Sequence, residues 1–242
     1  MERIVRLHEE RDIKCGKAKM EKKRKTIRYQ CLIFDHDDTT VNSTAKIHYP
    51  CFVEYMKIHR PGVSFTLDEY VSYNFHPGVQ KFFSEICGLS EEEQTDEQAY
   101  WYQYAKTHTA DAFNGIREIM EKHRAQGGII AVVSHSYAEN IMKDYRHNEL
   151  PLPDVIFGWE QPPEERKPAP VPVHRIMERY HLKPEEVLVI DDLKPGLDMA
   201  RAAGVHFAAA CWCFDIPENE AHMRANADYF CKRVSDLERI LF

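Results

Sequence analysis

Short continuous runs of apolar residues recur along the chain, and patterns with helical spacing separate most of them. The runs cover residues 29–34, 129–133, 154–157, 187–190 and 206–210. Continuous apolar runs are typical of strands that are buried on both faces of a parallel sheet. After the second run, Ser136 and Glu139 have the spacing of a helix capping box. Strands that alternate with helices through right-handed crossovers predict an α/β fold with a doubly wound parallel sheet.

The alternation of strands and helices breaks between residues 38 and 112, where no strand-like run occurs. Aromatic and apolar positions in this segment follow helical spacing instead. Two further capping boxes are indicated there, at Thr66 with Glu69 and at Ser90 with Glu93. An all-helical insertion is therefore predicted directly after the first strand.

The composition is that of an ordinary globular protein, with 43% hydrophobic and 29% charged residues in a chain of 242. No apolar stretch approaches the roughly 20 residues that cross a bilayer, so no membrane span is expected. The aromatic run at residues 100–104 lacks interleaved basic residues, which favours packing within the insertion over nucleic-acid binding.

Charge is distributed unevenly along the chain. Residues 1–29 hold 11 Lys and Arg against 5 Asp and Glu, so the remaining residues carry a net charge of −13. We expect residues 1–28 to form a flexible, solvated basic tail outside the fold. Because this tail lacks the apolar core and cleavage site of a secretory signal, the expected location is the cytoplasm.

The seven cysteines support a reducing compartment. Their number is odd, they include no Cys-x-x-Cys pair, and none has histidine partners at zinc-finger spacing. Cys211 and Cys213 form the one close pair, in an apolar segment that resembles a strand. We interpret them as buried, reduced thiols.

Carboxylates gather where two of the predicted strands end. Asp35, Asp37 and Asp38 follow the first strand, and Asp191 and Asp192 follow the fourth. Ligands of doubly wound folds bind outside the carboxyl ends of the strands, which is where these side chains are expected. Crowded carboxylates repel one another unless a cation neutralises them, and Mg²⁺ prefers oxygen ligands. The sequence therefore predicts a magnesium site at this edge of the sheet.

Two other loops at the same edge offer groups that bind anions. The second strand ends in Ser134, which leads into a helix amino terminus. Lys167 lies in a proline-rich loop after the third strand.

These residues resemble the four motifs of the haloacid dehalogenase-like superfamily, and they occur in the family's order. The matching residues are Asp35-His-Asp37-Asp-Thr39, Ser134, Lys167 and Asp191-Asp192. The resemblance extends from about Tyr29 to the carboxyl terminus. It implies a Rossmann-like core at residues 29–40 and 112–242, with a helical cap at residues 41–111. The cap resembles that of the subgroup containing phosphoglycolate phosphatase and β-phosphoglucomutase. Asp38 departs from the common glycine, and Leu193 from the common serine.

The resemblance implies a chemical role for each motif residue. Asp35 would be the nucleophile that forms an aspartyl phosphate, and Asp37 the general acid and base. Thr39 would hydrogen-bond within the loop to position Asp37. Ser134 and Lys167 would bind the oxygens of the transferring phosphoryl group.

The resemblance also implies a Mg²⁺ site. Its ligands would be the Asp35 carboxylate, the backbone carbonyl of Asp37 and the Asp192 carboxylate. Asp191 would be either a further ligand or a group behind the ligands. The ion would shield the negative nucleophile from a negative substrate.

A candidate for substrate recognition lies in the helical insertion. Residues 73–81 fall where relatives with helical caps present a loop to the substrate. His76, Gln80 and Lys81 are candidates for contacting the leaving group, and His76 is the residue that we assign to substrate binding.

We predict a Mg²⁺-dependent phosphatase that acts on a small phosphorylated metabolite. A phosphomutase of the β-phosphoglucomutase type is an alternative, because it uses the same motifs. A binding or regulatory protein that keeps the fold without turnover is a second. Dinucleotide binding is disfavoured, since no Gly-x-Gly-x-x-Gly follows the first strand. The sequence determines neither the substrate nor the oligomeric state.

Overall fold

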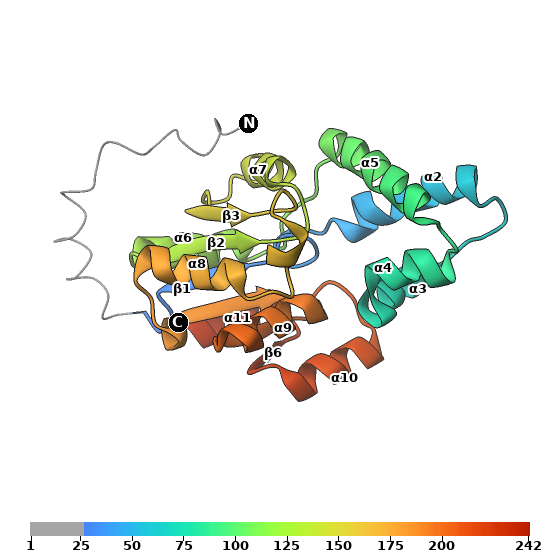
Figure 1. Ribbon diagram of the computed structural model, residues 1–242. Helices are drawn as coiled ribbons and strands as arrows, with labels where there is room; N and C mark the ends of the chain where they lie inside the picture. The colour runs from blue at the N-terminus through green and yellow to red at the C-terminus, as the bar shows by residue number, and fades with distance from the viewer. Residues whose placement is uncertain (1–26) are drawn as a thin grey trace.

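A single parallel sheet organises the chain, and a computed structural model describes residues 27–242 (Figure 1). The six strands are hydrogen-bonded in the order β3-β2-β1-β4-β5-β6. They are β1 (Cys31–Phe34), β2 (Ile129–Val133), β3 (Val155–Phe157), β4 (Val187–Asp191), β5 (His206–Ala210) and β6 (Tyr229–Cys231). The predicted α/β fold is confirmed. β6 is a three-residue strand at the sheet edge, and it was not predicted from the sequence.

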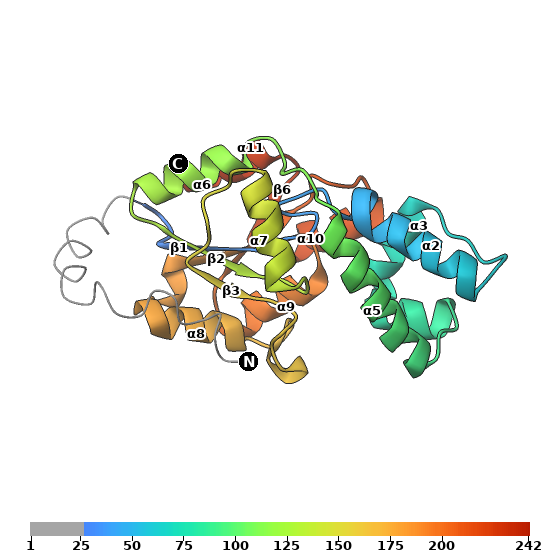
Figure 2. The ribbon, with the colours of Figure 1, turned by 90° about the horizontal axis from the view of Figure 1, so that it is seen from above.

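Helices cover both faces of the sheet. One face packs against α8 (Val171–Tyr180), α9 (Lys194–Ala203) and α10 (Pro217–Asn226), and the other against α6 (Ile116–Ala125), α7 (Ala138–His147) and α11 (Val234–Leu241). Figure 2 shows α8 and α9 on one side of the strands and α6 and α11 on the other. Along β1, Ile33 belongs to the first hydrophobic core and Leu32 to the second. Both faces are thus buried, which explains why the strands are apolar throughout.

A helical layer, here called the cap (residues 44–107), follows β1 and stands beside the sheet domain (Figure 1). Its elements are η1 (Thr44–His48), α2 (Tyr49–His59), α3 (Leu67–Tyr73), η2 (Asn74–Gly78), α4 (Val79–Lys81), η3 (Phe82–Ile86) and α5 (Glu91–Thr107). The capping boxes predicted at Thr66 and Ser90 are confirmed at the starts of α3 and α5. The short helices η4 (Pro163–Glu165) and η5 (Pro184–Glu186) lie in the sheet domain.

The cap has its own aromatic core, and the sheet domain contributes to it. Phe52 and Phe82 are fully buried at its centre. Phe214 and Ile216, from the loop between β5 and α10, pack into the same cluster. Phe75 of η2 also stacks edge-on against His222 of α10. The cap is therefore connected to the sheet domain by side-chain packing as well as by its two chain crossings.

The capping box predicted at Ser136 and Glu139 is wrong. Tyr137 is the N-cap of α7 and makes no side-chain cap bond, while the backbone N–H of Ala138 donates to Glu160 Oε1 at 2.8 Å. Ser136 donates its hydroxyl to Asp37, and Glu139 accepts a hydrogen bond from Tyr102 of the cap. Both side chains are thus engaged by partners far away in the sequence.

Cys211 and Cys213 lie in the loop after β5, which ends at Ala210, so placing them on a strand was wrong. Both are half-buried rather than buried. All six cysteines between residues 27 and 242 are free thiols. Cys15 and nearly all of the predicted basic tail lie outside the described residues. No helix between residues 27 and 242 is long and apolar enough to cross a membrane.

Candidate active site

The strand order places two of the predicted carboxylate groups next to each other. The order reverses between β1 and β4, and such a reversal leaves a crevice at the carboxyl ends of the strands. Asp35 directly follows β1, and its backbone N–H donates to the carbonyl of Ile190 in β4 at 2.8 Å. Asp191 is the last residue of β4. The two side chains therefore meet at the sheet edge.

Lys167 lies between these two carboxylates. Its Nζ donates to Asp35 Oδ1 at 2.8 Å and to Asp191 Oδ2 at 2.7 Å. All three side chains are buried, with Lys167 only 7% exposed. Burial alone would lower the pKa of Lys167, but the charges of Asp191 and Asp35 outweigh it and hold the pKa above its usual range. The lysine is therefore a fixed positive charge beside Asp35.

Both oxygens of Asp191 are occupied by protein donors. Oδ2 accepts from Lys167, and Oδ1 accepts the backbone N–H of Leu193 at 2.8 Å. Gly196, in the first turn of α9, leaves room for this carboxylate, because a Cβ there would lie 2.1 Å from Oδ2. Asp191 therefore fixes Lys167 and the start of α9.

The carboxylates of Asp35, Asp191 and Asp192 form one cluster. One oxygen from each lies within 4.8 Å of the others. Burial, followed by the charges of Asp191 and Asp35, raises the pKa of Asp192 well above its usual range. Three carboxylates with one ammonium group beside them leave excess negative charge in a largely buried site. An oxygen donor set of this kind fits a hard divalent cation such as Mg²⁺.

Thr39 does not position Asp37 as expected. Its hydroxyl donates to Asp192 Oδ1 at 3.1 Å instead. The chain turns at residues 38–40, and Thr39 there contacts Asp192, the residue that follows β4. Thr39 therefore orients a carboxylate of the acidic cluster.

Asp37 is held by three other donors. Oδ1 accepts from Ser43 at 2.7 Å and lies 2.8 Å from His48 Nε2, while Oδ2 accepts from Ser136 at 2.6 Å. Burial would raise the pKa of Asp37, but the adjacent His48 and the hydrogen bonds from His48 and Ser136 outweigh it and hold the pKa well below its usual range. The surroundings thus favour the carboxylate form.

Asp38 stands at a backbone position that favours glycine. Its φ is +56°, in the left-handed region, where Asp is among the better tolerated side chains. Its carboxylate Oδ1 accepts the backbone N–H of Thr44 at 3.0 Å, at the start of η1. Asp38 thus adopts the left-handed backbone conformation that glycine usually provides. Its side chain also bonds to Thr44, the first residue of η1.

The second predicted strand places Ser134 and His135 at the same edge. Ser134 is buried, and its hydroxyl oxygen accepts the backbone N–H of Ser136 at 3.2 Å. His135 Nε2 lies 3.0 Å from the carbonyl oxygen of Lys167. Burial, and then the positive charge of Lys167, lowers the pKa of His135 to about 4. His135 is therefore neutral near pH 7 and can donate to the Lys167 backbone.

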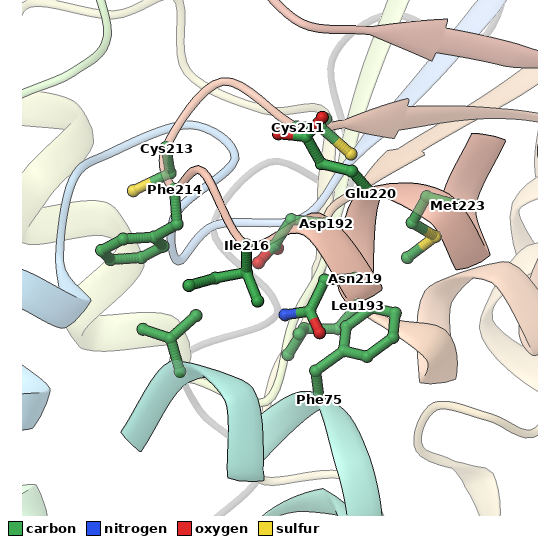
Figure 3. Close-up of a pocket in the computed structure, with 12 residues that line it drawn as sticks. Phe75, Asp192, Leu193, Cys211, Cys213, Phe214, Ile216, Asn219, Glu220 and Met223 are labelled. Carbon is green, nitrogen blue, oxygen red and sulfur yellow. The ribbon is translucent and has the colours of Figure 1, made fainter. Parts of the chain in front are cut away.

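A cavity of about 40 Å³ adjoins the acidic cluster between the sheet domain and the cap. Figure 3 shows Asp192 and Phe75 facing it, with Asn219 of α10 between them. Phe75 reaches the cavity, whereas the next residue, His76, is exposed and does not line it. A substrate contact by His76 stays a prediction.

Sequence reasoning missed the residues that hold Asp37. Ser136 has the spacing of a helix cap and lies beside Ser134 at a strand end, but its bond to Asp37 was not predicted. Ser43 and His48 carry no such signal, because they lie in the turn and helix that lead into the cap. Trp101 of α5 was missed as well. Its indole Nε1 donates to His48 Nδ1 at 2.7 Å.

Comparison with known families agrees with this arrangement. Residues 32–210 match the model of the haloacid dehalogenase-like hydrolase family. The match covers well over half of the chain, and it includes all four strand ends that carry the site. The chain belongs to the haloacid dehalogenase-like hydrolase family and is an enzyme of the hydrolase class.

Individual relatives are more distant. A phosphoglycolate phosphatase of Nitrosospira multiformis is 31% identical over 110 residues, which is 44% of this chain and 48% of that protein. The pyrophosphatase PpaX of Bacillus cereus is 22% identical over 217 residues, 89% of this chain and 97% of that protein. The first match thus spans about half of the relative's length.

Solved structures share the fold. A haloacid dehalogenase-like hydrolase from Bacteroides fragilis superimposes with a TM-score of 0.74 at 24% identity, covering 86% of this chain and 99% of that one. CbbY from Rhodobacter sphaeroides, solved in complex with xylulose-(1,5)bisphosphate, gives a TM-score of 0.67 at 17% identity, covering 86% and 96%. At these identities the likeness shows the fold alone.

Proposed function

We propose that the protein is a Mg²⁺-dependent phosphatase that hydrolyses a small phosphate monoester through an aspartyl-phosphate intermediate. The observation that carries the proposal is the surroundings of Asp35. Its carboxylate sits at the β1/β4 crevice, touches Lys167 through one oxygen, and belongs to the acidic cluster with Asp191 and Asp192. Phosphatase names among the relatives agree with this chemistry.

In the first step, an oxygen of Asp35 attacks phosphorus, and the bond from phosphorus to the leaving oxygen breaks. The leaving oxygen takes a proton from the carboxyl group of Asp37. Lys167 and Ser134 bind the equatorial oxygens, where negative charge must be stabilised. Lys167 can do so because Asp191 already holds its Nζ in the crevice.

In the second step, water attacks the phosphorus of the aspartyl phosphate. Asp37, now a carboxylate, accepts the proton of that water, and the bond between phosphorus and Asp35 breaks. Three donors around Asp37 favour this carboxylate form. Inorganic phosphate leaves, and Asp35 is regenerated.

Mg²⁺ would be held by Asp35 and Asp192 together with the backbone carbonyl of Asp37. When bound, it would offset the repulsion between Asp35 and an anionic substrate. Both oxygens of Asp191 already accept protein donors, which favours a supporting role for Asp191 over direct ligation.

The test is a phosphate-release screen over phosphorylated sugars, glycolate-like acids, nucleotides and pyrophosphate, with and without Mg²⁺. We expect release by the wild type in the presence of Mg²⁺ and none by Asp35→Asn. Asp198→Asn, an exposed carboxylate on α9, is the matched control and should retain full activity. His76→Ala should alter KM or substrate preference if His76 contacts the leaving group.

The other outcomes are equally informative. Isomerisation of a sugar phosphate without release would replace the phosphatase by a phosphomutase. Equal phosphate release by wild type and Asp35→Asn would exclude the aspartyl-phosphate mechanism. No turnover of any compound in the panel would favour a binding protein without catalytic activity.

A further inference from the structure

A chain of hydrogen bonds runs from the cap to Asp37. The indole Nε1 of Trp101, on α5, lies 2.7 Å from His48 Nδ1, and His48 Nε2 lies 2.8 Å from Asp37 Oδ1. Asp37 belongs to the loop after β1, while Trp101 and His48 belong to the cap. This chain of hydrogen bonds therefore links the cap to the sheet domain.

The direction of these bonds follows from the chemistry of the donors. An indole N–H can only donate, so Nδ1 of His48 must accept and the proton of the ring sits on Nε2. His48 then donates to Asp37 Oδ1. A proton added at Nδ1 would face the indole N–H and break that bond. Trp101 thus selects the tautomer of His48.

The two oxygens of Asp37 have different partners. Oδ1 accepts from the hydroxyl of Ser43 and from Nε2 of His48. In this tautomer Nε2 carries the ring proton, so it can only donate. Oδ2 contacts the hydroxyl of Ser136, which can accept as well as donate. A proton on Oδ2 is therefore compatible with all three neighbours, whereas a proton on Oδ1 would meet a donor.

Trp101 is itself seated against the sheet domain. Its ring lies 6.0 Å from the ring of Tyr137, the residue that precedes α7 and follows Ser136. His48 is nearly enclosed, with 13% of its side chain exposed. A displacement of α5 from α7 would therefore act on His48 through Trp101.

We propose that Trp101 and His48 are positioning residues that fix Oδ1 of Asp37 and leave Oδ2 as the oxygen that donates and accepts the proton. Correct seating of the cap then sets the orientation of the general acid and base. The inference rests on the proposed function, since it assigns a geometry to the proton transfer at Asp37.

The variants remove the two hydrogen bonds of His48 one at a time. His48→Asn keeps an acceptor for Trp101 and withdraws the donor from Asp37, whereas His48→Gln places an amide N–H near the position of Nε2. Trp101→Phe keeps the ring and removes the indole donor. Tyr102→Phe is the matched control. Tyr102 follows Trp101 on α5 and donates its hydroxyl to Glu139 of the sheet domain, but it does not bond to His48.

The kinetic readout compares kcat/KM for phenyl phosphate and p-nitrophenyl phosphate. The two have nearly the same shape, but phenolate leaves poorly and needs the proton of Asp37 more. We expect His48→Asn to lose at least about tenfold more activity on phenyl phosphate, within the range that general acids contribute. Trp101→Phe should show a smaller loss with the same preference, and His48→Gln should recover most of it. Tyr102→Phe should affect both substrates equally.

Equal losses on both substrates in His48→Asn and Trp101→Phe, or the same preference in Tyr102→Phe, would overturn the inference. Turnover of p-nitrophenyl phosphate shows that a variant is folded. Should His48→Asn not fold, Trp101→Phe decides alone.

A second measurement does not depend on catalysis. The indole N–H resonance of Trp101 in ¹⁵N-labelled protein, assigned with Trp101→Phe, should move in Asp37→Asn and stay in place in Tyr102→Phe. An unmoved resonance in Asp37→Asn contradicts the chain of hydrogen bonds. No phosphate release by the wild type combined with a moving resonance would refute the proposed function and leave the geometry standing.

Discussion

Glu97 offers a test of burial in the cap that is independent of the catalytic reaction. It lies on α5 and is only 7% exposed. Burial raises its pKa from 4.5 to about 7, and the neighbouring His48 offsets only part of this effect. The folded protein therefore holds a proton on Glu97 at pH values where the unfolded chain has released it.

The sign of the pH dependence follows directly. Between pH 4.5 and about 7 the folded state binds more protons than the unfolded state, so stability falls as the pH rises through this window. Each pKa unit corresponds to about 1.36 kcal/mol, so charged Glu97 destabilises the fold by about 3 kcal/mol above pH 7. Glu97→Gln removes the charge while nearly keeping the shape.

Urea unfolding of wild type and Glu97→Gln at pH 5 and pH 8 measures this effect. We expect near-equal stabilities at pH 5 and a variant that is more stable by about 2 to 3 kcal/mol at pH 8. Glu85→Gln, an exposed residue of the cap, is the control and should change stability by less than about 0.5 kcal/mol at either pH. If Glu97→Gln is no more stable than wild type at pH 8, Glu97 is not held in a desolvated site.

Two further predictions concern the acidic cluster. Thr39→Val removes the donor to Asp192, so the Mg²⁺ concentration that gives half-maximal activity should rise about tenfold with little change in kcat at saturation, as expected for groups behind metal ligands; an unchanged Mg²⁺ titration would contradict this. Gly196→Ala places a Cβ 2.1 Å from Asp191 Oδ2, and we expect a loss of at least about tenfold in kcat/KM, since misplacing a supporting group by an ångström has effects of that size or more. Wild-type activity in this variant would show that α9 yields without disturbing Lys167.

The sheet and the acidic cluster were predictable because both depend on local sequence. A strand that is buried on both faces must be apolar throughout, and the carboxyl ends of neighbouring parallel strands meet at one edge. Asp35, Ser134, Lys167 and Asp191 could thus be placed together from their positions after strands. The capping boxes at the starts of α3 and α5 were predictable for the same reason, since each bonds over three residues.

The surroundings of Asp37 were not predictable from local spacing. Ser136 has the spacing of a helix cap, but α7 begins one residue too late for it to be the N-cap, and its hydroxyl donates to the carboxylate of Asp37, 99 positions earlier. Thr39 and His48 likewise bond to partners that only the folded turn brings near. The bond between His48 and Trp101 spans 53 positions within the cap. Such contacts depend on tertiary packing, which no periodicity encodes.

The hydrophobic core of the cap includes side chains from the sheet domain, which affects how the cap could be exchanged with that of a relative. Because Phe214 and Ile216, from the loop between β5 and α10, fill part of the cap's aromatic cluster, the helical insertion is not a self-contained module in this chain. A chimera with crossover points placed only at the two chain crossings would leave the donor cap without these side chains and with a void in its core. Recombination with a relative should therefore carry residues 211–216 along with the cap, which makes a second, discontinuous segment part of any functional graft.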